Sequence, residues 1–267
     1  MRRLFASVLV ASAAGIGCAT GQLRLPTGPG IPRSDFVALF NQAATGCRDV
    51  RTITADLSVS GRTAGQRLRG RVQAGLAAPA AVRLEAPAPF GAPLFILAAQ
   101  NERGTLLLPR DRRVVRDAAV RDIVNALAGI ELGAADLRAL LSGCVLPDPR
   151  PQAGRQYPGG WAAIDLQDGG IAWLRQMSGH WRLAAGEHAG LRVEFGGYGP
   201  RAADTPRQLR LSTAPASRAP GVDVRISLTQ VELNVPLGAE AFTVTIPPET
   251  TPITLGELRG NGPLSGP

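Results

Sequence analysis

Lysine is absent from this chain of 267 residues, so all 29 basic residues are arginine. Without a lysine amine, the protein cannot form a Schiff base with a carbonyl substrate. Histidine is almost as scarce, and we interpret His180 and His188, on one predicted strand, as polar strand residues rather than metal ligands. The GxSxG, HExxH, P-loop and GxGxxG patterns are also missing. We therefore expect no catalytic residues, no metal and no cofactor, and a protein that is not an enzyme.

The sequence also lacks an apolar run long enough to cross a membrane. Its longest candidate, residues 4–16, has about 13 apolar or small residues, whereas a spanning helix needs roughly 20. This run follows Arg2 and Arg3, and a short apolar run after basic residues is typical of a secretion signal. We predict that residues 1–17 are a signal peptide and that the remainder is exported.

The predicted signal ends in Gly15-Ile16-Gly17-Cys18, where a small residue precedes a cysteine. This resembles the lipobox that lipoprotein signal peptidase cuts, although that motif usually has Leu or Val where Gly15 stands. The alternative is an ordinary signal peptide cut near Ala19, with Cys18 incidental. We predict lipidation at Cys18, followed by a tether over residues 18–33 that holds the folded domain off the membrane.

Only two further cysteines exist, Cys47 and Cys144, and no CxxC pattern is present. An even pair in an exported protein favours a disulfide, because the compartment is oxidising. Free buried thiols are the alternative.

The net charge is +8, and loss of Arg2 and Arg3 with the signal leaves about +6. A basic surface attracts anionic lipid headgroups or nucleic acid. For an exported protein we favour lipid and expect no nucleic-acid partner. The arginines are spread along the predicted strands, so the simplest interpretation is a solvated sheet face.

The hydrophobic pattern predicts an α+β fold. A helix over residues 35–45 would begin at Ser34 and stop at Gly46. After it the period changes from 3.6 to 2, which indicates antiparallel strands with one wet and one dry face. The apolar phase slips inside one long strand near Thr229 and Gln230, which predicts a bulge. Strands are expected near residues 52–60, 67–74, 82–85, 94–99, 105–108, 113–116, 161–166, 171–177, 180–185, 191–195, 208–212, 222–235 and 242–246, and short helices near residues 120–127 and 137–141.

A sheet this large must curl. We expect a half-barrel, in which the short helices cover the concave face of one large curved antiparallel sheet. The domain is predicted to span residues 34–250. Residues 251–267 are rich in Pro and Gly, and we expect a flexible tail with a last contact around residues 255–258.

Two segments carry a resemblance to a known family. Residues 85–97 read EAPAPFGAPLFIL, and residues 118–144 read AAVRDIVNALAGIELGAADLRALLSGC. Their order and spacing over residues 35–250 resemble the LolA/LolB-like superfamily, closest to the outer-membrane lipoprotein receptor family LolB. Positions that match the family pattern are Ile123, Leu127, Gly129, Leu137, Arg138, Leu141 and Gly143, with Val235-Pro236-Leu237, Phe242 and Ile246-Pro247 near the end.

The resemblance implies a curved sheet with helices in its mouth, and a receptor that takes acylated lipoproteins from a periplasmic LolA-like carrier. Phe90, between Pro89 and Gly91, matches the apolar residue on the family's protruding, membrane-inserting loop. A core aromatic beside a turn is the alternative for Phe90. The Cys47 and Cys144 pair has no counterpart that we can match in the receptor.

These observations predict a lipid-anchored protein of the outer membrane, facing the periplasm, which binds acyl chains or lipoprotein cargo in a hydrophobic cavity. The alternative is a non-enzymatic structural or assembly lipoprotein of the cell envelope. A cavity lined by Leu and Val would favour the first function, and a filled core under the sheet would favour the second.

Overall fold

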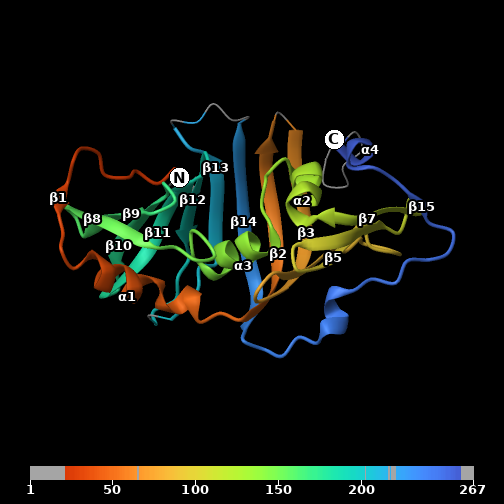
Figure 1. The fold of residues 1–267 in the computed structure, drawn as a ribbon, viewed down its shortest axis with the longest axis horizontal. Coiled ribbons are helices and arrows are strands. Elements are labelled where there is room, and N and C mark those ends of the chain that lie inside the picture. The colour runs from red at the N-terminus through yellow and green to blue at the C-terminus, as the bar shows by residue number, and fades with distance from the viewer. Residues whose placement is uncertain (1–21, 65, 202, 216, 218–220, 260–267) are drawn as a thin grey trace, which may run out of the picture.

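The body of the protein is a single twisted sheet, seen in a computed structural model that describes residues 22–64, 66–201, 203–215, 217 and 221–259 (Figure 1). The predicted signal peptide and Cys18 lie outside the described residues. The strands are β1 (Ile31–Pro32), β2 (Thr52–Thr63), β3 (Gln66–Ala77), β4 (Ala81–Ala86), β5 (Phe95–Gln100), β6 (Arg103–Leu108), β7 (Arg113–Ala119), β8 (Pro151–Tyr157), β9 (Trp161–Leu166), β10 (Ile171–Met177), β11 (His180–His188), β12 (Leu191–Gly196), β13 (Gln208–Thr213), β14 (Val222–Leu233) and β15 (Thr251–Pro252).

The strand order is β1-β8-β9-β10-β11-β12-β13-β14-β2-β3-β4-β5-β6-β7-β15. Neighbouring strands pair antiparallel except β15, which pairs parallel to β7. The two halves of the chain meet where β14 pairs with β2, so segments that are far apart in the sequence lie side by side at the centre.

Short helices lie across one face of this sheet (Figure 1). They are α1 (Phe36–Arg48), α2 (Val120–Ala128), α3 (Ala134–Ser142) and α4 (Leu255–Arg259). A 3-10 turn, η1 (Ala239–Phe242), lies against the opposite face, where Arg83 and Gln100 donate to its carbonyls. The chain leaves β7, passes through α2 and α3, and enters the sheet again at β8, near its opposite edge. The sheet stays open, because β1 and β15 do not pair with each other. The predicted α+β half-barrel, with helices on the concave face, is confirmed.

Period-2 alternation sets which side chains enter the core. On β2, Ile53, Ala55 and Leu57 are buried, while Ser58 and Ser60 are exposed on the other face. The inward side chains of both halves join those of α1, α2 and α3 in one continuous hydrophobic cluster. The predicted bulge is confirmed, since the pairing of β14 with β2 shifts register between Thr229 and Glu232, and Gln230 has φ +50°.

Three sequence predictions about elements were wrong. The strand over residues 242–246 does not form, because Phe242 ends η1. Arg83 from β4 donates to the carbonyls of Ala241 and Thr243, which in a strand would accept hydrogen bonds from a neighbouring strand. Strand β8 was missed, because its sequence PQAGRQY is too polar to show alternation. Helix α1 continues past Gly46 to Arg48, because Cys47 in its last turn is buried against the core.

The described residues of the predicted flexible tail are in fact packed. Thr251 and Pro252 pair with β7, and Leu258 on α4 is 1% exposed. The contact expected around residues 255–258 is therefore confirmed, but residues 251–259 belong to the folded domain. Within the described part of the chain, no helix combines the length and apolar character needed to cross a membrane.

Candidate functional site

The loop between β4 and β5 carries the predicted Pro89-Phe90-Gly91 motif. Its base is closed by the pair Ala86 and Phe95, with the N–H of Leu94 donating to the carbonyl of Ala86 at 2.8 Å. Gly91 has φ +77°, a conformation that favours glycine. Phe90 is 88% exposed, the most exposed large hydrophobic residue described. The alternative that Phe90 is a core aromatic is therefore wrong.

The backbone of this loop is held from the side by Arg110, in the turn between β6 and β7. The Arg110 guanidinium donates to the carbonyl of Phe90, and its Nε donates to the carbonyl of Ala92 at 3.0 Å. The Phe90 ring is thus presented to solvent on a supported backbone. Sequence analysis missed Arg110, because its distance of about twenty positions from the loop gives no local signal.

The second predicted site, Cys47 and Cys144, forms a disulfide with Cα atoms 5.5 Å apart. It joins the last turn of α1 to the residue after Gly143, where α3 ends with φ +96°. Both cysteines are buried in the main cluster, so the bond ties two of the covering helices together across 97 positions.

Arg138, one of the positions that match the family pattern, has a structural contact. Its Nη1 donates to the carbonyl of Val50 at 2.9 Å, which links α3 to the start of β2. Desolvation by burial, followed by the charge of Arg51, lowers the pKa of Arg138. The guanidinium nevertheless remains charged at neutral pH.

The helix-covered face was expected to hold a cavity lined by Leu and Val. Ile123 and Leu127 of α2 and Leu140 of α3 are instead packed into the continuous cluster with Leu76 and Leu97 of the sheet. All five are less than 10% exposed. The described side chains on this face therefore pack against one another in the manner of a filled core.

The N-terminal segment was expected to be a tether, yet residues 23–28 lie against the outer face of the sheet and residues 31–32 pair with β8. Leu23 and Leu25 pack against a second, smaller cluster that includes Trp161 and Trp173. Tyr157 donates its hydroxyl to the carbonyl of Gly28 at 3.2 Å. The tether prediction is therefore wrong for this segment, because Trp161 on β9 and Trp173 on β10 form an apolar surface that it helps to bury.

The two histidines lie at the ends of β11. His188 Nδ1 is 4.0 Å from Asp168 Oδ2, and both side chains are partly exposed. Among the residues that the structure describes, no group of three or more His, Cys, Asp or Glu side chains is arranged to hold a metal ion.

The architecture defines a class of protein: an open antiparallel half-barrel with helices on its concave face. In this chain the loop that joins β4 and β5 also exposes an aromatic side chain. Solved structures share this fold. A LolA superfamily protein from Nitrosomonas europaea superposes with a TM-score of 0.52 at 10% sequence identity, over 77% of this chain and 97% of that chain. A DUF1329 family protein from Desulfovibrio piger gives a TM-score of 0.50 at 12% identity, over 77% and 96%.

The protein thus has the fold of LolA superfamily proteins, in agreement with the broader resemblance in its sequence. At identities this low the likeness concerns the fold alone. No protein-family model matches the chain, and no curated protein matches it.

Proposed function

We propose that this protein is a lipid-anchored lipoprotein of the outer membrane, facing the periplasm, that binds acyl chains or lipoprotein cargo and helps to place them in that membrane. The observation that carries the proposal is the 88% exposure of Phe90 on a loop supported by Arg110. Diacylation of Cys18 would supply the anchor, and a periplasmic LolA-like carrier would deliver the cargo. The proposed role needs no catalytic group and no cofactor.

The energetics fit a loop that perturbs a membrane without anchoring the protein. Burial of a Phe side chain in the acyl boundary of a bilayer stabilises the contact by about 1.5–3 kcal/mol. This is too little to hold a protein on a membrane alone. It is sufficient to engage a bilayer that the anchor already keeps close.

Phe90→Glu tests the proposal. The thermal unfolding temperature should stay near that of the wild type, because an exposed side chain contributes within about 0.5 kcal/mol to stability. Transfer of acylated cargo to liposomes should fall. Ile31→Glu is the matched control, since Ile31 is also a strongly exposed hydrophobic residue, at 72%, but lies on β1. Unchanged transfer in Phe90→Glu, or an equal loss in both variants, would show that the loop has no such role.

A second candidate is a structural or assembly lipoprotein of the envelope. The observation that favours it is the continuous packing of α1, α2 and α3 on the sheet, which leaves the described core filled. Native mass spectrometry of protein purified without detergent exchange separates the two functions. A bound acyl ligand supports lipid handling, and ligand-free protein with no transfer activity supports the structural role.

A further inference from the structure

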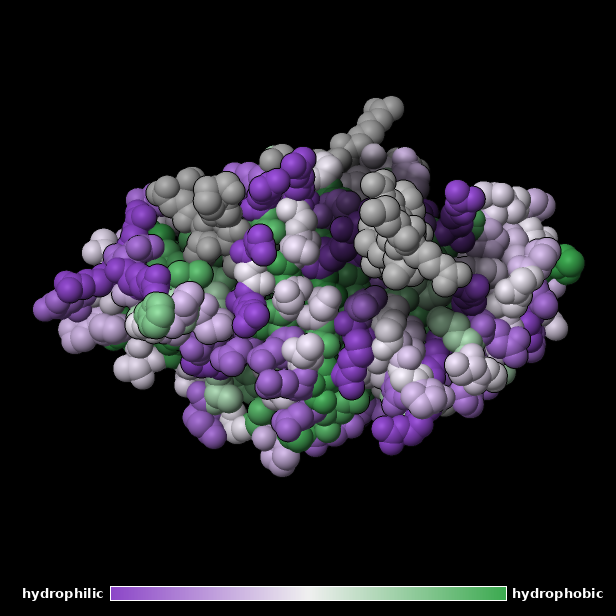
Figure 2. Space-filling model, turned by 180° about the vertical axis from the view of Figure 1, so that it is seen from behind, coloured by the Kyte–Doolittle hydropathy of each residue, from purple (hydrophilic) through white to green (hydrophobic). Residues whose placement is uncertain are grey.

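The face of the sheet opposite the helices carries a row of polar residues that crosses five strands. Strand pairing places Glu194, Arg210, Arg225, Ser60 and Arg69 next to one another, on β12, β13, β14, β2 and β3 in turn. On each strand at least one flanking residue belongs to the main core or packs against it, so alternation turns this row outward. Figure 2 shows this side of the molecule, where hydrophilic residues lie among pale and hydrophobic ones.

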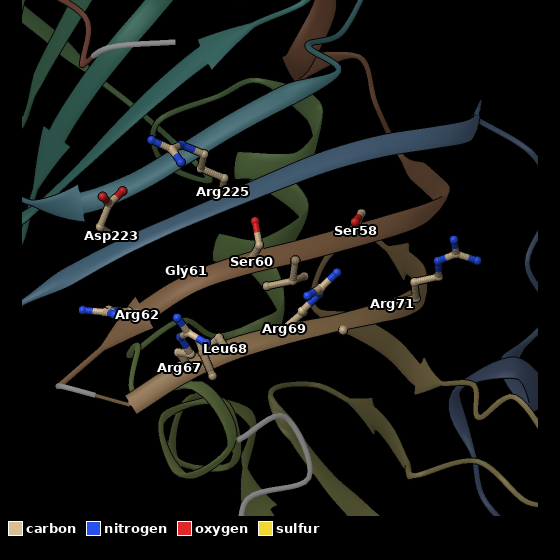
Figure 3. A pocket seen from close by; sticks show the side chains of 12 residues that line it. Ser58, Ser60, Gly61, Arg62, Arg67, Leu68, Arg69, Arg71, Asp223 and Arg225 are labelled. Atoms are coloured by element: carbon tan, nitrogen blue, oxygen red, sulfur yellow. The ribbon is translucent and has the colours of Figure 1, made fainter. Parts of the chain in front are cut away.

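Part of this face is hollowed into a groove of about 840 Å³ (Figure 3). Arginines from three strands converge there, together with the exposed hydroxyls of Ser58 and Ser60. The arginines that line the groove are Arg62, Arg67, Arg69, Arg71 and Arg225. All five are exposed, and within the described residues none of them has an ion-pair or hydrogen-bond partner.

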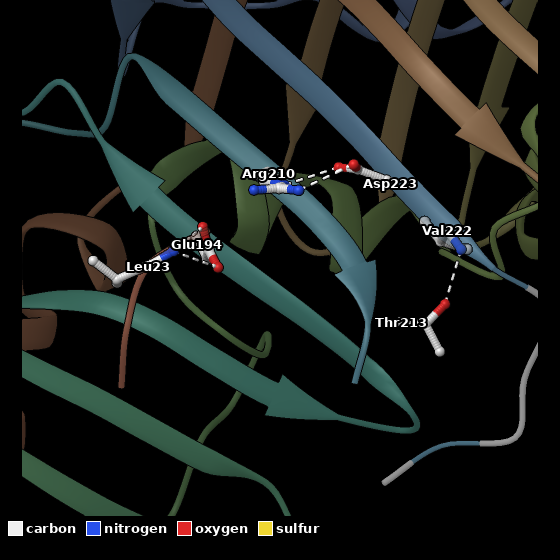
Figure 4. Close-up of polar contacts among 6 residues, drawn as sticks. All are labelled: Leu23, Glu194, Arg210, Thr213, Val222 and Asp223. Atoms are coloured by element: carbon white, nitrogen blue, oxygen red, sulfur yellow. Dashed lines mark hydrogen bonds and ion pairs between the residues drawn. The ribbon is translucent and has the colours of Figure 1, made fainter. Parts of the chain in front are cut away.

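The carboxylate of the groove, Asp223, is already engaged. Arg210 donates to both of its oxygens, at 2.8 and 3.0 Å (Figure 4). The guanidinium groups of the groove therefore remain available for a ligand. Arginine suits phosphate oxygens in particular, because its planar group donates two parallel hydrogen bonds.

The described chain begins close to this groove, in the segment that follows the predicted lipid anchor. Leu23 lines a neighbouring hollow together with Arg210 and Arg225, and Arg225 also lines the groove. Cys18 precedes Leu23 by five positions, which an extended chain spans in at most about 18 Å. An anchor at Cys18 would hold this face close to the membrane surface.

We propose that the arginine groove binds the phosphate headgroups of anionic lipids and turns the outer face of the sheet toward the membrane. The orientation rests on the lipid anchor of the proposed function, whereas headgroup binding does not. A purely protective role is the competing explanation, because residues 66–72 of β3 have no partner on β4, and charges on an open edge prevent pairing with other chains.

The test uses the full chain with Cys18→Ser, so that no lipid anchor contributes. Binding is measured by flotation with vesicles of phosphatidylcholine alone and of phosphatidylcholine with phosphatidylglycerol. The neutral vesicles report the apolar contribution of residues 1–17. Arg2 and Arg3 add the same anionic preference to every variant, so the groove is measured from the difference between variants. We expect binding to the anionic vesicles to be stronger by about tenfold or more, and to weaken with added salt.

The groove variant combines Arg69→Glu, Arg71→Glu and Arg225→Glu, which keeps the open edge charged. Its matched control combines Arg116→Glu, Arg150→Glu and Arg259→Glu, three exposed arginines outside the groove that give the same change in net charge. The groove variant should lose most of the preference for anionic vesicles, and the control should keep it to within about twofold. Equal losses in both variants, no preference in the starting protein, or stabilisation by inorganic phosphate without vesicle binding would each overturn the proposal.

Because no lipid anchor is present, the vesicle result is independent of lipidation. The mass of the mature N-terminus tests the anchor separately. A failure of headgroup binding can therefore be told apart from a failure of the lipid anchor.

Discussion

Leu23 donates its backbone N–H to both carboxylate oxygens of Glu194, at 3.2 Å each, across 171 positions in the sequence (Figure 4). Glu194 is 9% exposed, so this contact is largely shielded from water. It fixes the start of the docked segment on β12, next to Arg210 on β13. The segment that follows the predicted lipid anchor is thus part of the fold.

Glu194→Gln should loosen this segment. Hydrogen bonds to charged groups contribute about 1.5–3 kcal/mol, and a neutral amide recovers only part of that. We expect faster hydrogen exchange in residues 22–30 and little change in β2 and β3. Glu232→Gln, an exposed glutamate on β14, serves as the control. Unchanged protection of residues 22–30 would mean that Leu23 and Leu25 dock through the aromatic cluster alone.

Lipidation at Cys18 is a separate prediction, motivated by the apolar run that ends at Gly17. One acyl chain binds a membrane only marginally, so a diacylated cysteine is needed for stable anchoring. Cys18→Ser should release the protein from membranes or leave it uncleaved. Mass spectrometry of the wild type should find an acylated Cys18 at the mature N-terminus, and any other N-terminus would refute the prediction.

Loss of the Cys47 and Cys144 disulfide should destabilise the domain. The bond closes a loop of 97 positions. Chain-entropy estimates for a loop of this size give about 4–5 kcal/mol, and measured values are often lower. The double variant Cys47→Ala/Cys144→Ala should unfold at lower urea concentration, and the wild type with reductant should match it. Equal midpoints with and without reductant would contradict the prediction.

The Arg210 and Asp223 pair should give a small, pH-dependent contribution to stability. The hydrogen bond from Arg210, followed by the charge of Arg210 and then Arg225, lowers the pKa of Asp223 despite partial desolvation. Because the folded-state pKa is the lower one, the contribution is present above the unfolded-state value of about 3.9 and is lost as the pH falls below it.

Asp223 is half exposed, so solvent screening limits the contribution to about 1 kcal/mol or less. Urea unfolding of the wild type and Asp223→Asn should differ near neutral pH and converge in acid. A difference that persists unchanged in acid would assign the effect to packing.

Much of the fold could be predicted from local pattern. Alternation such as Ile53, Ala55 and Leu57 gives both the strand and its buried face, because side chains on a strand point alternately to opposite sides. The phase slip gave the bulge at Gln230 in the same way. The predictions for two segments were wrong. Strand β8 was missed because its sequence has no apolar alternation, and no strand forms after Phe242, where Arg83 binds the backbone carbonyls.

The candidate sites also combine features that the local sequence encodes with features that only distant contacts decide. The Pro89-Phe90-Gly91 loop is encoded locally, because prolines cannot donate to a ladder and glycine permits the turn. The sequence alone could not decide whether Phe90 lies in the core or is exposed. The tertiary structure decides this through Arg110, which holds the loop from another turn.

The sequence by itself determined that residues 52–60 and 67–74 form strands and which of their faces is wet. It did not determine which strands are neighbours. Arg62 and Arg69 appeared spread out, and only the pairing of β14 with β2 brings Arg225 beside them. That pairing joins residues from 159 to 180 positions apart, and their proximity follows from closing the whole core rather than from any local preference. The arginine groove and the docked N-terminal segment are therefore products of the tertiary structure.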